Sequence, residues 1–192
     1  MTRLISEQVR SIPVSLEEYD RRFRKITGAT LAEVAAAAAG FEPGQLSPGK
    51  RSISIIPLSS GFGIIEGFSE AVLAIAQYLG FQAVITAEKD LAGLVEAYRS
   101  TVEAIILADD NTYAAINIKT GRVCDNDEAT AAGFVTALSR MAGGLLGKEV
   151  LLIGAGKVGR ATAEKLVQAG AKLLVHDLDK KNCRSADRST CQ

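Results

Sequence analysis

The sequence predicts an α/β protein, and three observations support this fold class. Short apolar runs alternate with helix-like stretches over residues 52–118, and the alternation resumes over residues 149–177. Such alternation is typical of strands that are joined by crossover helices. A glycine-rich turn follows the apolar run at 150–153, as at the start of many strand–turn–helix units. Apolar residues make up 47% of the chain, which is ample for a packed core.

The first 42 residues are expected to be helical. Ser15 with Glu18, and Thr30 with Glu33, have the spacing of a capping box at the start of a helix. The alanine run that ends at Gly40 also favours a helix. We interpret this region as a scaffold or an oligomer-forming arm.

The middle of the chain is expected to form a small parallel α/β domain. Its strands are rich in β-branched residues, and its helices carry one apolar face. A connector with Pro and Gly residues separates it from the N-terminal helices. The expected strands are 52–57, 82–86, 104–108 and an additional strand at 113–118, and the expected helices are 68–79 and 92–98. A long helix at about 128–142 is expected to link this domain to the next one.

Two polar clusters are expected at the carboxyl ends of strands, where open parallel sheets bind their ligands. Ser59 and Ser60 follow the first strand, and Asp109 opens an Asp-Asp-Asn sequence after the third. Hydroxyls and carboxylates at this edge could hold the ammonium and carboxylate groups of an amino acid. An adjacent acid pair is also electrostatically costly without a cationic partner. The alternative is that the serines form only a turn and the acids form only a cap.

The most specific pattern lies near the end of the chain. A strand at 150–153, the sequence G-x-G-x-x-G, a helix at 160–168 and a strand at 172–176 follow one another, and Asp177 ends the second strand. This order and spacing predict a dinucleotide-binding unit. An S-adenosylmethionine site also uses an acid after its second strand, and a glycine turn that binds nothing is a further alternative, but the complete spacing favours the dinucleotide.

Each glycine of this pattern has its own physical reason. Gly154 permits the tight turn, Gly156 lets the backbone approach a pyrophosphate, and Gly159 lets helix and strand touch. The amides at the helix N-terminus face the phosphates. Asp177 can accept both ribose hydroxyls and would repel a 2′-phosphate, so NAD is predicted over NADP. The predicted cofactor-binding residues are Gly154, Ala155, Gly156, Lys157, Val158, Gly159 and Asp177.

Composition excludes several classes of function. Lys plus Arg equals Asp plus Glu at 22 each, so we expect no binding to nucleic acid or to a charged membrane surface. No apolar run approaches the ~20 residues that span a bilayer, and no apolar signal core opens the chain, so a cytoplasmic protein is expected. Three scattered cysteines and one histidine predict neither a disulfide framework nor a metal site.

The chain from about residue 55 to residue 177 resembles the pyrrolysine synthase family. The resemblance rests on SSGFGIIEGFSEAVLAIAQYLGF, then AIILADDNTYAAINIKTGRVCDND, then VLLIGAGKVG. The glycine motif is shared with many dehydrogenases. The Ser-Gly-x-Gly-Ile-Ile and Ala-Asp-Asp-Asn-Thr segments ahead of it are specific to this family.

The resemblance implies a two-domain, homodimeric dehydrogenase with bound NAD. Its substrate would be the small-molecule isopeptide of L-lysine and 3-methyl-D-ornithine. Oxidation of the terminal amine of the ornithine part gives an imine or aldehyde, and the α-amine then closes the pyrroline ring with loss of ammonia. Asp109 and Asn126 are the expected catalytic residues, and Asp109 is the main anchor of a substrate ammonium. Ser59, Ser60 and Asn126 are also expected to bind the substrate, and Phe68 is expected to form a wall of the pocket.

The expected domains are a helical and α/β substrate domain at 1–127, a linking helix at 128–147, and a partial Rossmann-type NAD-binding domain at 148–192. One strand–helix–strand unit supports the adenosine half of the cofactor site. We therefore expect a chain shortened by truncation or a frame shift, with residues 183–192 not native. Two alternatives stay open: another two-domain amino-acid or folate-type dehydrogenase, and a non-catalytic NAD-binding remnant.

Overall fold

The computed structural model describes residues 6–42, 44–45, 49 and 51–179. The chain forms two compact units. Unit 1 combines residues 1–22 with 44–126, and unit 2 combines residues 23–43 with 127–192. The prediction for residues 183–192 lies outside the described residues.

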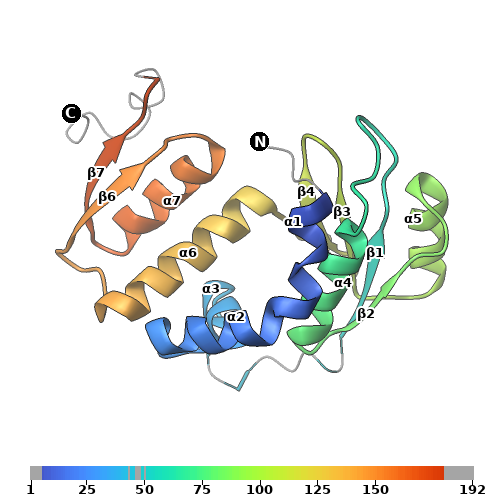
Figure 1. Ribbon diagram of the computed structural model, residues 1–192, viewed down its shortest axis with the longest axis horizontal. Coiled ribbons are helices and arrows are strands. Elements are labelled where there is room, and N and C mark those ends of the chain that lie inside the picture. Colours follow the sequence, from blue (N-terminus) through green and yellow to red (C-terminus); the bar gives the residue numbers. More distant parts are fainter. Residues whose placement is uncertain (1–5, 43, 46–48, 50, 180–192) are drawn as a thin grey trace. The chain divides into compact units, whose positions relative to one another are not determined.

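Unit 1 is built on a five-stranded sheet of order β2-β1-β3-β4-β5 (Figure 1). β1 pairs in parallel with both β2 and β3, which confirms the predicted parallel α/β core. The strands are β1 (Ser52–Ile56), β2 (Gln82–Ile85), β3 (Ala104–Ala108), β4 (Tyr113–Asn117) and β5 (Val123–Asp125).

The outer strands β4 and β5 are antiparallel, so the prediction of a parallel domain is wrong for this edge of the sheet. β3 and β4 are joined by a tight turn, in which the amide of Asp109 donates to the carbonyl of Thr112 at 2.8 Å. A parallel neighbour needs a crossover of a dozen or so residues. The short connection therefore dictates a hairpin.

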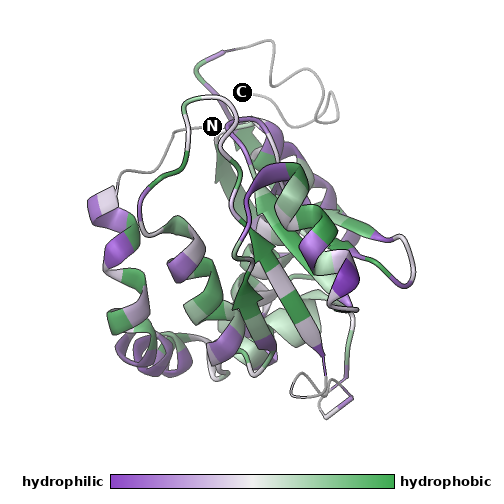
Figure 2. Cartoon of the chain, turned by 90° about the vertical axis from the view of Figure 1, so that its right-hand side faces the viewer, coloured by the Kyte–Doolittle hydropathy of each residue, from purple (hydrophilic) through white to green (hydrophobic). Residues whose placement is uncertain are grey.

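Helices cover both faces of β1 (Figure 1). Ile53 and Ile55 pack with Val72 of α4, whereas Ile56 packs with Ala97 of α5. Successive strand residues point to opposite faces, so β1 is buried on both sides. Figure 2 shows the strands of this sheet largely in hydrophobic colours. The helices that belong wholly or partly to unit 1 are α1 (Ser6–Arg10), α2 (Ile12–Thr27), α4 (Phe68–Tyr78) and α5 (Asp90–Arg99).

One predicted capping box is wrong and the other is confirmed. Ser15 lies inside α2, and its hydroxyl donates to the carbonyl of Ile12 at 3.3 Å. The helix begins earlier because Pro13 is tolerated in a first turn. Thr30 caps α3 as predicted, since its Oγ1 accepts from the Glu33 amide at 3.2 Å and the Glu33 carboxylate accepts from the Thr30 amide at 2.7 Å.

Unit 2 contains a strand–helix–strand unit with two parallel strands, as the sequence predicts. One face of this strand pair packs under helices around the fully buried Leu166. The other face leaves Leu151 and Ile153 exposed. None of the helices in the described ranges combines the length and the apolar character that a membrane crossing requires. The remaining elements are α3 (Leu31–Ala38), α6 (Asn126–Ala142), β6 (Glu149–Ile153), α7 (Lys157–Gln168) and β7 (Lys172–His176).

Candidate functional site

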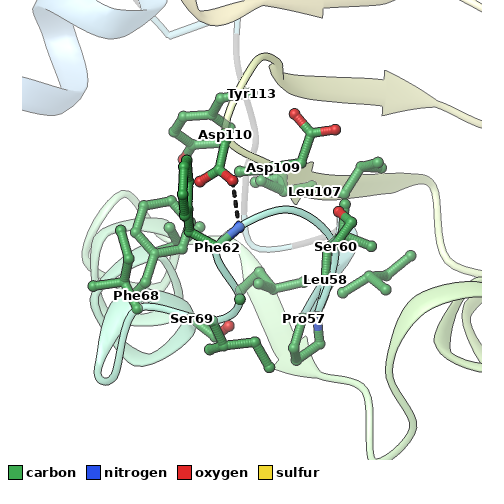
Figure 3. Close-up of a pocket in the computed structure, with 18 of the residues that line it drawn as sticks. Pro57, Leu58, Ser60, Phe62, Phe68, Ser69, Leu107, Asp109, Asp110 and Tyr113 are labelled. Atoms are coloured by element: carbon green, nitrogen blue, oxygen red, sulfur yellow. Dashed lines mark hydrogen bonds between the residues drawn. The ribbon is translucent and has the colours of Figure 1, made fainter. Parts of the chain in front are cut away.

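Unit 1 holds a cavity of about 420 Å³ beyond the carboxyl ends of β1 and β3 (Figure 3). This is the edge where open parallel sheets bind ligands, and the volume suits a small molecule. Most of the lining is apolar, and polar groups are confined to a few positions. The apolar wall includes Ile55, Leu58, Ile64, Phe68, Ile106 and Leu107.

The cavity brings together several residues that the sequence analysis singled out. Ser60 follows β1, Phe68 begins α4, Asp109 follows β3 and Asn126 begins α6, and all four line the cavity. Ser59 is not among the lining residues. Their roles toward a substrate remain predictions.

Asp109 is an exposed carboxylate held by its own turn. Its Oδ1 accepts hydrogen bonds from the amides of Asn111 and Thr112, both at 2.7 Å. These two bonds, first that of Asn111 and then that of Thr112, lower the pKa of Asp109 below its usual range. Asp109 thus caps its turn, as the alternative interpretation expects. It is also a preformed anion at the rim of the cavity, where it can attract a cationic group.

Asp110 fastens the loop that follows β1. Its Oδ2 accepts from the amide of Phe62 at 2.6 Å (Figure 3). Gly61 has φ +68°, and a Cβ on it would overlap that same carboxylate oxygen. The loop therefore reaches Asp110 because residue 61 is glycine. Phe62 is 87% exposed at the mouth of the cavity.

Ser59 has a structural partner in α5. Its amide donates to Asp90 Oδ1 at 2.7 Å and its hydroxyl donates to Oδ2 at 2.5 Å. The hydroxyl first, and the amide next, lower the pKa of the Asp90 carboxyl. Asp90 has φ +53°, a conformation that is uncommon for a non-glycine residue. The Ser59 bonds fix the start of α5, and no local sequence pattern predicts this long-range pair.

Tyr113 is a cavity residue that the sequence analysis missed. Its ring meets Phe68 edge to face, with centroids 5.7 Å apart and an interplanar angle of 69°. Burial raises the pKa of the Tyr113 phenol, so it stays protonated at neutral pH. The available signal was its place just after the Asp-Asp-Asn-Thr turn, which returns the chain to the same sheet edge.

The glycine loop of unit 2 has the backbone that its sequence predicts. Gly154 follows β6 with φ +97°, and a Cβ on Gly159 would overlap the carbonyl oxygen of Gly154. Gly156 is the N-cap of α7 and makes no side-chain capping bond. The first-turn amides of α7, at Lys157 and Val158, are therefore available for an anion.

Asp177 lies against this glycine loop. Its Oδ2 accepts from the amide of Ala155 at 2.6 Å, and its Oδ1 accepts from the amide of Asp179 at 2.7 Å. Arg160 Nε donates to the Ala155 carbonyl at 3.2 Å and steadies the loop from the helix side. Amide donors, a glycine that admits close approach and a carboxylate form a donor and acceptor set that fits an adenine dinucleotide.

The fold and the cavity define an α/β protein with a small-molecule pocket in one unit and a glycine loop in the other. Residues 8–124 match the family model described as pyrrolysine biosynthesis protein PylD, N-terminal domain. A pyrrolysine synthase of Methanosarcina acetivorans is 35% identical over 94% of this chain and 67% of its own length. A pyrrolysine synthase of Methanosarcina barkeri is 32% identical over 93% of this chain and 66% of its own length. The chain belongs to the pyrrolysine synthase family, and it spans about two thirds of the length of these relatives.

Proposed function

We propose that this chain acts in pyrrolysine biosynthesis as an NAD-dependent dehydrogenase of an amine. The observation that carries the proposal is the ionised Asp109 at the rim of an apolar cavity, in a member of the pyrrolysine synthase family. A carboxylate at this position suits a substrate that carries ammonium groups on an aliphatic chain.

The proposed substrate is the isopeptide of L-lysine and 3-methyl-D-ornithine. Asp109 binds one substrate ammonium, while Ser60 and Asn126 orient neighbouring polar groups. Phe68, supported by the ring of Tyr113, packs against the methylene and methyl groups. This division of roles matches the lining, which is apolar apart from a few polar positions.

The glycine loop and Asp177 would hold NAD, which supplies a hydride acceptor when bound. The terminal CH₂–NH₂ carbon of the ornithine part loses a hydride, and its nitrogen loses a proton, so that an imine forms. The α-amine then adds to the imine carbon, and ammonia leaves as the pyrroline ring closes. Hydrolysis of the imine to an aldehyde before ring closure is the variant route. Asp109 keeps the substrate in register during these steps.

The test is a turnover assay on the purified chain with NAD and the isopeptide. We expect formation of NADH, release of ammonia and a product with the mass of pyrrolysine. NAD should support the reaction better than NADP, because Asp177 would meet the 2′-phosphate with a negative charge. Sedimentation of the same sample measures whether the chain is the homodimer that we propose.

Two other outcomes would replace this proposal. Turnover of a plain amino acid or a methylene-folate, with no reaction of the isopeptide, would indicate another two-domain dehydrogenase. Binding of NAD without turnover of any of these substrates would indicate a non-catalytic binding protein. The variant Asp177→Ala is the control for NAD binding in either case.

A further inference from the structure

The first turn of α4 lies at the cavity and contains a backbone amide that has no acceptor among the described residues. Gly67 is the N-cap, with φ +84° and no side-chain capping bond. The amide of Phe68 donates to the Ile65 carbonyl at 3.1 Å, and the amide of Ala71 donates to the Gly67 carbonyl at 2.9 Å. Within the described part of the chain, the amide of Ser69, between them, has no acceptor. The turn therefore keeps an open donor.

Ser69 adds a second donor at the same place. Its side chain lines the cavity, and the residue is 7% exposed to solvent. Among the residues that the structure describes, no partner for its hydroxyl is found. The structure describes no fully buried side-chain oxygen without a partner, so the Ser69 hydroxyl is open to the cavity, where it can donate to an acceptor on a ligand. The neighbouring lining residues Phe68 and Val72 are apolar and cannot supply that acceptor.

Two polar parts of the cavity lining favour ligand groups of opposite charge. Figure 3 shows Phe68 and Ser69 of α4 on one side and Asp109 and Asp110 of the β3–β4 turn on another. The helix start offers donors and the positive end of a helix dipole, which favour an anion. The turn offers carboxylates, which favour a cation. Glu70 carries a negative charge on the same helix turn, but it does not line the cavity.

We propose that Ser69 and the first turn of α4 bind the free carboxylate of the substrate. The proposal rests on the proposed function for the identity of that substrate. In the isopeptide the free carboxylate belongs to the lysine part, since the ornithine carboxyl is used in the isopeptide bond. Ser69 at one wall and Asp109 at another then recognise the two charge types of one ligand and fix its direction in the cavity.

The experiment is a calorimetric titration of the full chain with two ligands, in the presence of NADH, which cannot accept a hydride and so leaves the ligands unreacted. One ligand is the isopeptide, and the other is its carboxamide, in which the lysine carboxylate is converted to a neutral primary amide. The unaltered chain should bind the acid at least about 10-fold more tightly than the carboxamide, because a charge-assisted hydrogen bond is lost with the amide. Ser69→Ala should weaken binding of the acid by about 10-fold and leave the carboxamide nearly unchanged.

Two control variants separate this effect from packing and from the ammonium site. Ser69→Cys keeps the side-chain volume but is a weak donor, so it should resemble Ser69→Ala in affinity while retaining the melting temperature. Asp109→Asn should weaken both ligands by the same factor, because the carboxylate and the ammonium are bound at different walls. Thermal melting of each variant establishes that it is folded.

The outcomes distinguish this inference from the function on which it rests. Equal binding of acid and carboxamide by the unaltered chain would overturn the carboxylate site alone, as would an equal loss of both ligands in Ser69→Ala. No binding of either ligand at millimolar concentration would overturn the proposed function, and the carboxylate site with it.

Discussion

The candidate sites of the two units offer different kinds of chemical group to a ligand. In unit 2, the groups offered to a ligand are mainly the first-turn backbone amides of α7, at Lys157 and Val158, which follow the glycine loop. In unit 1, the groups are side chains, such as the Asp109 carboxylate and the Ser60 hydroxyl. A site that binds through backbone groups should lose affinity when a Gly→Ala substitution adds a methyl group. A site that binds through side chains should lose affinity when a substitution removes a charged or hydroxyl oxygen. The predictions that follow test this difference.

The largest effect is expected for Gly159→Ala. The added Cβ would overlap the backbone oxygen of Gly154, which cannot move without displacing β6. Overpacking typically costs about 1–3 kcal/mol and occasionally more, and contact with backbone puts this site at the upper end. Chemical denaturation measures the loss of unfolding free energy.

Gly156→Ala is the matched control for that variant. A Cβ there meets nothing within 4 Å, and its φ of −68° suits any residue. We expect normal stability with at least about 10-fold weaker NAD binding, because the methyl group occupies the path of the pyrophosphate. Unchanged NAD affinity would show that the backbone of this loop does not bind the phosphates.

The second largest effect is expected in the loop after β1, which is held to Asp110 by the amide of Phe62. Gly61→Ala combines a left-handed φ of +68° with overlap of the Asp110 carboxylate, so the Phe62 hydrogen bond should break. Gly63→Ala has a similar φ of +82° but meets nothing within 4 Å. Both variants should lose about 1–2 kcal/mol to backbone strain, but Gly61→Ala should also lose substrate affinity. Equal affinities in the two variants would argue against a role for the Asp110 contact.

A moderate effect is expected for Asp109→Asn. Removal of the charge should raise the substrate KM by about 10- to 100-fold, as for the loss of a hydrogen bond to a charged group. NAD affinity and melting temperature should change little, because Asp109 is exposed and an amide oxygen can still accept from the turn. A variant with an unchanged KM would exclude Asp109 as the ammonium anchor.

The smallest effect separates two adjacent serines. Ser59→Ala removes the hydroxyl that donates to Asp90, so the melting temperature should fall by about 2–4 °C. Ser60→Ala, at a cavity-lining position, should leave melting unchanged and weaken substrate binding by several-fold. If the two variants behave alike, the structural and ligand roles of this pair are not separated as the geometry indicates.

The Ser59 pair also predicts a pH dependence. The pKa of Asp90 is lower in the folded chain than its ordinary value of about 3.9. A carboxyl whose folded pKa is depressed contributes stability above the unfolded pKa, and that contribution is lost as the pH falls through the folded pKa. Ser59→Ala should therefore be less stable than the unaltered chain at neutral pH, and the difference should shrink on acidification. Melting curves between neutral and acid pH measure this.

The pattern of apolar residues predicted most of the strands and helices of unit 1. The predictions that were wrong have physical causes. β1, β2, β3 and the helices between them were predicted, because buried parallel strands are short apolar runs. The direction of β4 was not, because it depends on a tight turn at Asp109 rather than on the composition of the strand. The start of α2 was missed because a serine and a glutamate at capping distance also occur inside helices.

The sequence by itself determined the family, the alternation of strands and helices, and the glycine loop, because each depends on residues close together in the chain. The tertiary structure decided which polar side chains line a common cavity. It placed Ser69 and Tyr113 in the same cavity as Asp109, and it turned Ser59 toward Asp90. These arrangements depend on contacts between distant segments and on burial, and no local pattern records either of them.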